Sequence, residues 1–171
     1  MLLVGGASTR FGSPKALVQL GGETLAARAW RVLGEACVER MATGKTADGL
    51  ALPFPLLDDG NDVRAPLAGI VAGLRAAHHE VVVVLPVDVP LVTAALLRRL
   101  AAACRDAAVT QTGPLPGAYR RTALPALERA LAGGRLKLRD ALDGLDVAVV
   151  EADAAELANV NSPEELARLR S

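Results

Sequence analysis

The amino-acid sequence predicts an α/β fold with three layers (α/β/α), in which helices cover both faces of a mostly parallel, twisted sheet. Short apolar runs alternate with longer segments of helical pattern over most of the 171 residues, as in proteins built around parallel strands. The strongest run, residues 81–85, is unbroken and mostly β-branched, which is typical of a strand buried on both faces. A single domain over residues 1–171 is the simplest organisation for this length.

The individual elements follow from periodicity and from the residues that interrupt it. Helical patterns cover residues 23–36, 67–78, 93–103, 121–131, 135–142 and the segment from 163 onward. Extended apolar segments cover residues 2–4, 16–20, 37–43, 53–57, 81–85, 107–112, 113–119 and 147–150. Glycine pairs make a turn at 21–22 and a helix break at 133–134. Pro66 suits the first turn of a helix, and Ser162 with Glu165 forms a capping box.

Composition limits the classes of function. Hydrophobic residues make up 51% of the chain and aromatic residues 2%, so the core must consist of Leu, Val and Ala. The formal net charge is zero, whereas a nucleic-acid binder would carry a basic excess. No apolar run reaches about 18 residues, and the start lacks a basic, cleavable leader. We therefore expect a cytoplasmic protein that binds neither nucleic acid nor membrane.

The loop after the first predicted strand is the most informative stretch. Gly5 and Gly6 end the strand, and adjacent glycines let backbone N–H groups approach an anion closely. Arg10 and Lys15 follow on a loop too rich in Gly, Ser and Pro for a helix. Backbone donors, a guanidinium and an ammonium are what a triphosphate needs. Neither the P-loop pattern nor the dinucleotide fingerprint G-x-G-x-x-G occurs in this loop.

A carboxylate follows the strongest predicted strand. Asp88 lies in the segment Pro-Val-Asp-Val-Pro, residues 86–90, whose prolines stiffen the loop. In α/β sheets, ligands bind beyond the carboxyl ends of the strands. We therefore predict that Asp88 is a metal ligand.

The first loop resembles the signature L-x-G-G-x-S-x-R-x-G-x-x-K of the MobA-like nucleotidyltransferases. It meets every fixed position, namely Leu3, Gly5, Gly6, Ser8, Arg10, Gly12 and Lys15. Three further segments match in the family's order. The first is the guanylyltransferase motif G-P-L-A-G at residues 65–69, with Ala65 in place of the first Gly, and its preceding Asp is Asp58. The others are D-x-P at Asp88 and N-V-N-[ST]-P-E-[DE]-L at residues 159–166.

The resemblance implies a nucleotide-diphospho-sugar transferase-like (Rossmann-like) fold and a nucleotidyl transfer reaction. In the guanylyltransferase branch, GMP passes from GTP to molybdopterin, giving molybdopterin guanine dinucleotide and pyrophosphate. The implied cofactor is Mg²⁺ and the implied substrates are GTP and molybdopterin. Other proteins of molybdenum cofactor biosynthesis are implied as partners.

The resemblance also assigns expected roles to residues. Arg10, Lys15 and Asp88 are expected to be catalytic, with Asp88 holding Mg²⁺. The expected nucleotide-binding residues are Leu3, Val4, Gly5, Gly6, Lys15, Thr43, Asp58, Pro66 and Asp88, with the Asp58 carboxylate accepting from a guanine edge. The expected acceptor-binding residues are Arg135, Asn159 and Asn161. Only one of the two asparagines is expected to face the site.

Three alternatives stay open at this point. A molybdopterin cytidylyltransferase or a sugar-phosphate nucleotidyltransferase would keep the fold and change the substrates. A non-catalytic nucleotide-binding relative is also compatible with Ala65 and with the short hairpin at residues 107–119. The presence of both Lys15 and Asp88 argues against this last alternative.

Overall fold

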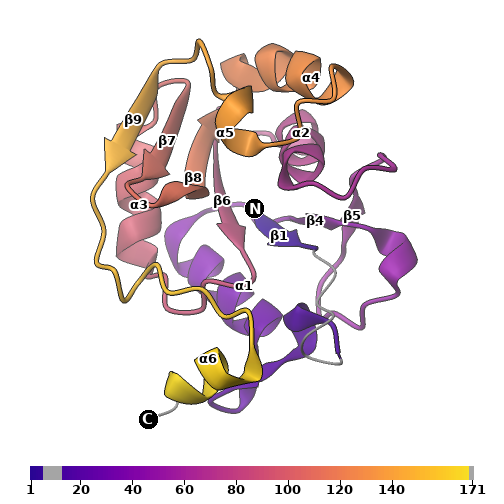
Figure 1. Ribbon diagram of the computed structural model, residues 1–171, viewed down its shortest axis with the longest axis vertical. Coiled ribbons are helices and arrows are strands. Elements are labelled where there is room, and N and C mark those ends of the chain that lie inside the picture. Colours follow the sequence, from indigo (N-terminus) through magenta and orange to yellow (C-terminus); the bar gives the residue numbers. More distant parts are fainter. Residues whose placement is uncertain (6–12, 170–171) are drawn as a thin grey trace.

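A seven-stranded sheet in the order β5-β4-β1-β6-β8-β7-β9 crosses the part of the chain that the computed structural model describes, residues 1–5 and 13–169 (Figure 1). Its strands are β1 (Leu2–Val4), β4 (Ala42–Gly44), β5 (Leu57–Asp58), β6 (Val81–Pro86), β7 (Ala107–Thr110), β8 (Gly113–Arg120) and β9 (Val147–Val150). Only β8 runs antiparallel to its two neighbours, β6 and β7, and the other described pairs are parallel. The predicted mostly parallel sheet is therefore confirmed.

Helices cover both faces of this sheet (Figure 1). They are α1 (Leu25–Ala36), α2 (Pro66–Ala76), α3 (Ala94–Ala103), α4 (Leu124–Ala132), α5 (Leu138–Ala141) and α6 (Pro163–Arg168). Buried residues of α1, α3 and α6 form one core cluster, and those of α2, α4 and α5 form a second. Strand β1 divides between them by strict alternation, because Leu2 and Val4 join the first cluster and Leu3 the second. The α/β/α layering is confirmed.

The segment before α1 differs from its prediction. Residues 16–20 were expected to be extended, but Lys15–Leu17 is a 3₁₀ helix and only β2 (Gln19–Leu20) is a strand. Strand β2 pairs with β3 (Glu23–Thr24) across two glycines with φ of 60° and 87°, a conformation that costs glycine little. Thr24 then caps α1 by accepting from Ala27 N at 3.1 Å, so the helix begins at Leu25 rather than at residue 23.

Two helices near the carboxyl end behave differently. The helix expected over residues 135–142 is only Leu138–Ala141, because Gly134 takes φ 71° and turns the chain after α4. The capping box of α6 is confirmed: Glu165 N donates to Ser162 Oγ at 3.2 Å, and Pro163 occupies the first turn. None of the described helices is long and apolar enough to cross a membrane.

The sheet brings three strand ends to one edge. Because β1 is parallel to both β4 and β6, the chain leaves Val4, Gly44 and Pro86 on the same side. Contact between β1 and β4 is very close at this point: a Cβ on Gly44 would lie 2.0 Å from the carbonyl oxygen of Val4. Only glycine fits there, so this residue fixes how β4 ends beside β1.

Replacing Gly44 by alanine should destabilise the fold. The added methyl group meets backbone rather than a movable side chain, so β1 and β4 must separate, and we expect a loss of about 1–3 kcal/mol in the free energy of unfolding. Gly34→Ala is the matched control, because the nearest atoms there belong to the flexible Arg40 side chain. Urea unfolding of both variants tests this, and equal midpoints would contradict it.

Candidate functional site

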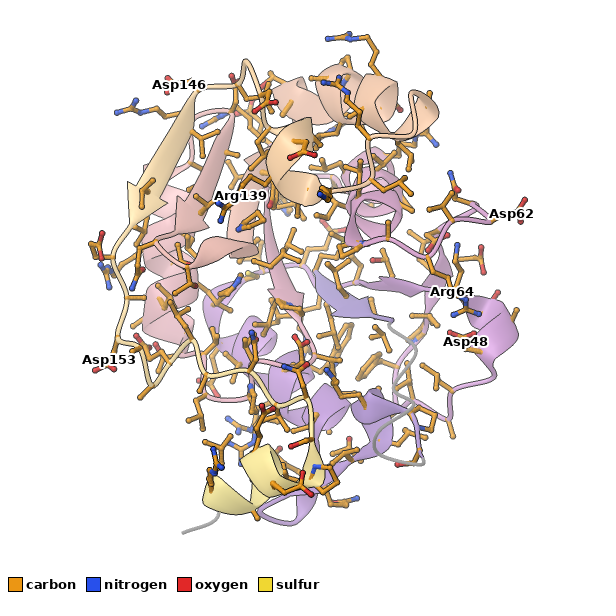
Figure 2. The ribbon with its side chains drawn as sticks, in the orientation of Figure 1. Asp48, Asp62, Arg64, Arg139, Asp146 and Asp153 are labelled. Atoms are coloured by element: carbon orange, nitrogen blue, oxygen red, sulfur yellow. The ribbon has the colours of Figure 1, made fainter. Side chains whose placement is uncertain are left out.

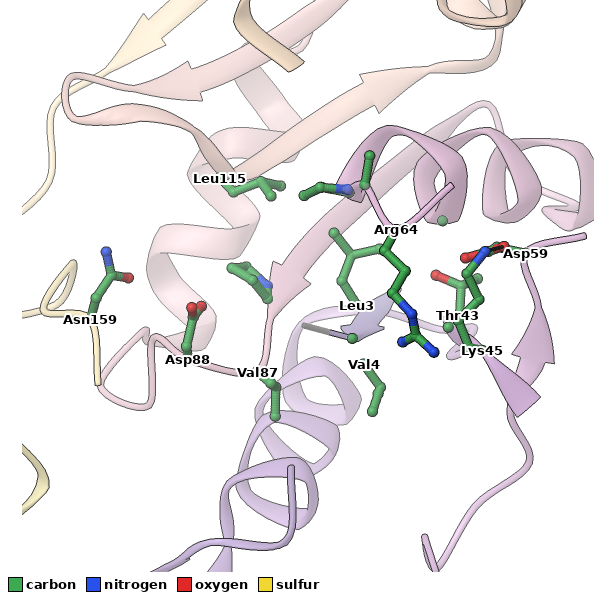
Figure 3. A pocket seen from close by; sticks show the side chains of 16 residues that line it. Leu3, Val4, Thr43, Lys45, Asp59, Arg64, Val87, Asp88, Leu115 and Asn159 are labelled. Atoms are coloured by element: carbon green, nitrogen blue, oxygen red, sulfur yellow. Dashed lines mark hydrogen bonds and ion pairs between the residues drawn. The ribbon is translucent and has the colours of Figure 1, made fainter. Parts of the chain in front are cut away.

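A pocket of about 460 Å³ lies at the carboxyl ends of β1, β4 and β6. It is lined by Leu3, Val4, Gly5, Thr43, Gly44, Lys45, Asp59, Arg64, Ala65, Pro66, Gly69, Pro86, Val87, Asp88, Leu115 and Asn159. In the close-up, Asp88 and Asn159 stand at one end, and Lys45 and Asp59 at the other (Figure 3). The pocket therefore has two polar ends separated by an apolar floor.

The first polar end is organised around Asp88. Lys15 Nζ donates to Asp88 Oδ2 at 3.2 Å and to Asn161 Oδ1 at 2.8 Å. The side chains of Lys15 and Asp88 are 18% and 30% exposed, so the ion pair is screened by water only in part. These contacts join residues that lie 73 and 146 positions apart in the chain.

The carboxyl-terminal segment supports this end. Val160 is fully buried, and its N–H donates to the carbonyl oxygen of Asp88 at 2.8 Å. Asn161 N donates to Glu165 Oε2 at 2.5 Å, which ties the asparagine to the start of α6. Asn159 lines the pocket and Asn161 holds Lys15. Only one of the two asparagines is thus in the pocket lining, although residues two positions apart in extended chain share a face.

The second polar end is a partly buried ion pair. Lys45, the residue after β4, donates from Nζ to Asp59 Oδ1 at 2.6 Å, and the two side chains are only 12% and 6% exposed. Lys45 Nζ also donates to the carbonyl oxygen of Asn61, and Asn61 N donates to Asp59 Oδ1 at 3.1 Å. Neither Lys45 nor Asp59 was among the site residues expected from the sequence.

Asp58 does not line the pocket, although it was expected to face the nucleoside. Its carboxylate accepts from the hydroxyl and the N–H of Thr46 and from Gly60 N, and it lies at the surface. These hydrogen bonds, that from the Thr46 hydroxyl above all, lower the pKa of Asp58 to about 2. Asp58 thus fastens two loops together, while its neighbour Asp59 enters the pocket.

Arg64 provides another link between the same loops. Its guanidinium makes two hydrogen bonds to the Asp48 carboxylate, at 3.0 and 2.7 Å, a bidentate geometry that fixes orientation as well as contact. The two side chains lie against each other at the edge of the molecule (Figure 2). The loop at residues 58–64 is therefore held on the loop at 45–49 by side chains from both.

The floor between the two ends is packed tightly. Thr43 is 1% exposed, and its hydroxyl donates to Met1 Sδ at 3.6 Å. A Cβ on Gly69 would lie 2.9 Å from Leu3 Cδ2 and 3.0 Å from Thr43 Oγ1. Glycine at position 69 therefore lets α2 approach β1 and β4 closely, and Pro66, in the first turn of α2, reaches the pocket.

Most of the expected site residues lie at this pocket, and the exceptions are specific. Those in its lining are Leu3, Val4, Gly5, Thr43, Pro66, Asp88 and Asn159. Lys15 and Asn161 lie beside the pocket and are joined by a hydrogen bond. Asp58 and the exposed Arg135 are not in the lining. Gly6 and Arg10 lie outside the described residues, as do Ser8 and Gly12 of the first-loop signature.

The residues beside Asp88 fit a divalent metal that also binds phosphate. Mg²⁺ is usually held by one or two carboxylates and completes its shell with water and substrate phosphate oxygens. Asp88 supplies a partly exposed carboxylate, and the amide of Asn159 lies in the same lining. No cluster of three or more His, Cys, Asp or Glu side chains occurs among the described residues, so a caged metal site is not formed by them.

A pocket of this shape, beyond the carboxyl ends of parallel strands and polar at both ends, is typical of α/β proteins that bind nucleotides. Comparison with known proteins agrees with this class. Residues 1–153 match the family described as the MobA-like NTP transferase domain. A curated relative, molybdenum cofactor guanylyltransferase from Pseudomonas putida, is 38% identical over 182 residues, covering 97% of this chain and 94% of its own.

Solved structures agree as well. The crystal structure of molybdopterin-guanine dinucleotide biosynthesis protein A from Archaeoglobus fulgidus superposes with a TM-score of 0.83 at 27% identity, covering 99% of this chain and 95% of that one. A cytidylyltransferase for 2-C-methyl-D-erythritol 4-phosphate from Thermus thermophilus, 24% identical with a TM-score of 0.74 over 99% and 95% of the two chains, shares the fold. The chain belongs to the MobA-like NTP transferase family, and it is a nucleotidyltransferase.

The lowered pKa of Asp58 predicts an acid-sensitive link between the two loops. A carboxyl whose pKa is lower in the folded than in the unfolded state stabilises the fold above its unfolded value of 3.8, and the contribution disappears as the pH falls toward about 2. Asp58→Asn should therefore lower the melting temperature at pH 6 but match the unmodified protein near pH 2.

Melting curves between pH 6 and pH 2 provide the measurement. Asp62→Asn is the control, because Asp62 points outward from the same loop (Figure 2). A difference between Asp58→Asn and the unmodified protein that stays constant down to pH 2 would contradict the assignment.

Proposed function

We propose that this nucleotidyltransferase transfers GMP from GTP to molybdopterin, giving molybdopterin guanine dinucleotide and pyrophosphate. The observation that carries the proposal is the two-ended pocket, with Lys15 and Asp88 at one end and the partly buried carboxylate of Asp59 at the other. The first end suits a triphosphate with its metal, and the second suits a base that donates hydrogen bonds. The relatives named as guanylyltransferases support the choice of substrates.

Positioning and charge neutralisation are the main catalytic tasks in this reaction. A terminal phosphate of the acceptor attacks the α-phosphorus of GTP, so two anions must meet in line. The Lys15 ammonium is the described cation closest to the metal-binding carboxylate, and we assign it to phosphate oxygens of the transferring group. Arg10 and the Gly5 and Gly6 amides are assigned to the same triphosphate. No general base is required, because the acceptor phosphate is already ionised at neutral pH.

Asp88 is the proposed ligand for the divalent metal, which we take to be Mg²⁺. Held there by Asp88, such an ion would offset the negative charge that develops on the transferring phosphates. The hydrogen bond from Val160 N to the Asp88 carbonyl fixes the loop that presents this carboxylate. Lys15 Nζ donates to the Asp88 carboxylate at 3.2 Å, so the ammonium lies next to the proposed metal-binding group.

Asp59 replaces Asp58 as the proposed base-binding carboxylate. Its side chain is only 6% exposed and lines the pocket, whereas the Asp58 carboxylate lies outside the lining and accepts from Thr46 and Gly60. A carboxylate accepts two N–H bonds from a guanine edge, which cytosine and adenine do not offer in the same arrangement. This contact separates the proposal from the cytidylyltransferase alternative.

The acceptor residues remain a prediction. Asn159 lies beside Asp88 in the lining, where it can contact a phosphate of the acceptor or of GTP. Asn161 acts on Lys15, since its amide oxygen accepts from that ammonium. Arg135 belongs to an exposed turn outside the lining, and an acceptor contact there requires a molecule that extends well beyond the pocket.

Removing the Lys15 ammonium should greatly reduce the turnover number while the protein still folds. Lys15→Ala deletes a preorganised cation at the reacting phosphates, for which a loss of about 10²–10³ in kcat is expected. The measurement is release of pyrophosphate from GTP in the presence of molybdopterin and Mg²⁺. Lys137→Ala, an exposed lysine at the start of α5, is the control and should retain full activity. Unchanged turnover in Lys15→Ala would refute the role.

A further inference from the structure

The proposed reaction uses only Asp59 of the partly buried ion pair at the second polar end of the pocket. Lys45 lies against Asp59 at 2.6 Å, and both side chains line the cavity (Figure 3). With exposures of 12% and 6%, they are the least exposed of the described ion pairs. A lysine that is largely shielded from water and lines a pocket offers charge-assisted hydrogen bonds that are stronger than neutral ones.

The hydrogen bonds already made leave one donor and one acceptor in this pair. Oδ1 of Asp59 accepts from Lys45 Nζ and from Asn61 N, while no described residue donates to Oδ2. The ammonium has three N–H groups, and its described acceptors are Asp59 Oδ1 and the carbonyl oxygen of Asn61. One lysine N–H thus remains for a ligand, together with Asp59 Oδ2, whose two lone pairs can accept two hydrogen bonds.

Guanine presents the complementary pattern. Its Watson–Crick edge carries the O6 acceptor next to the N1–H donor, followed by the 2-amino group. Adenine and cytosine carry an amino group in place of O6, so an ammonium would face another donor. A site that places a hydrogen-bond donor against a donor of the wrong base rejects that base, in addition to favouring the right one.

We propose that Lys45 is a specificity-determining residue that donates to O6 of guanine while holding Asp59 in place for N1–H and the 2-amino group. The inference rests on the proposed guanylyltransferase function and deepens it. It adds a repulsive element against ATP and CTP that Asp59 alone does not supply. Gly44 contributes by ending β4 in close contact with Val4, so that Lys45 enters the pocket directly after the strand.

The test is the nucleotide preference of Lys45→Met, a substitution that keeps length and removes the charge. Dissociation constants for GTP and ATP are measured by calorimetry in the presence of Mg²⁺. Loss of a charge-assisted bond should weaken GTP binding about tenfold to a hundredfold, while ATP binding stays equal or improves. The preference for GTP over ATP therefore falls at least about tenfold. Lys137→Met, the exposed control, should leave both constants unchanged.

A nucleotide analogue tests the same contact without relying on the variant. In 6-thio-GTP, a sulfur atom that accepts hydrogen bonds weakly replaces O6. The unmodified protein should bind it more weakly than GTP, and Lys45→Met should bind the two alike. Equal binding of GTP and 6-thio-GTP by the unmodified protein would overturn the proposal, even if Lys45→Met fails to fold.

The outcomes also separate this inference from the proposed function. An unmodified protein that does not prefer GTP refutes the guanylyltransferase function itself. A protein that prefers GTP, and keeps that preference in folded Lys45→Met as judged by circular dichroism, refutes only the role of Lys45.

Discussion

Parallel pairing of β1 with β4 and β6 is the constraint on which the site depends. Each strand contributes the residue that follows it: Gly5 after β1, Lys45 after β4, and the Asp88 loop after β6. Because all three strands point the same way, these groups meet at one edge of the sheet. The absence of a side chain at Gly44 allows β4 to come this close. The pocket is thus a direct product of strand direction and of one glycine.

Each described cation at or beside the pocket is paired with a carboxylate. Lys15 contacts Asp88, Lys45 contacts Asp59, and Arg64 contacts Asp48. The pairing keeps the local charge balanced in a chain of zero formal net charge, and it fixes side chains that would otherwise lose rotamer freedom on binding. The Lys15 and Lys45 pairs then have different tasks. Under the proposed function, Lys15 and Asp88 serve the triphosphate and its metal, whereas Lys45 and Asp59 serve the base.

The sequence was sufficient for the architecture and for most residues at the first polar end of the pocket, around Asp88. Residues 81–85 could be assigned to a central strand because an unbroken β-branched apolar run is typical of a strand buried on both faces. Ser162 with Glu165 specified the start of α6 because a capping box depends only on local hydrogen bonds. Asp88 was placed correctly beside the pocket because its position depends only on following that strand.

The second polar end, formed by Lys45 and Asp59, could not be predicted in the same way. Asp58 and Asp59 are identical side chains on successive residues, and successive residues of extended chain point to opposite sides. The register of β5 against β4, with Gly44 opposite Asp58, decides which carboxylate enters the pocket, and register depends on tertiary packing. The sequence around Lys45 does not indicate that it enters the pocket either, since a lysine after a short strand is ordinarily solvated. The contact between Lys15 and Asn161 spans 146 positions and also depends on the fold.

Nucleotide-dependent stabilisation tests the central claim most directly, namely that this pocket binds GTP together with a metal at Asp88. The melting temperature is measured with GTP, CTP or ATP, each with and without Mg²⁺, on the unmodified protein and on Asp88→Asn. A ligand at a hundred times its dissociation constant stabilises the folded state by about 2.7 kcal/mol. The account predicts that GTP raises the melting temperature more than the other nucleotides do. It also predicts that Mg²⁺ raises the melting temperature of the GTP complex further, and that this additional rise disappears in Asp88→Asn. A preference for CTP, or an equal Mg²⁺ increment in Asp88→Asn, would contradict it.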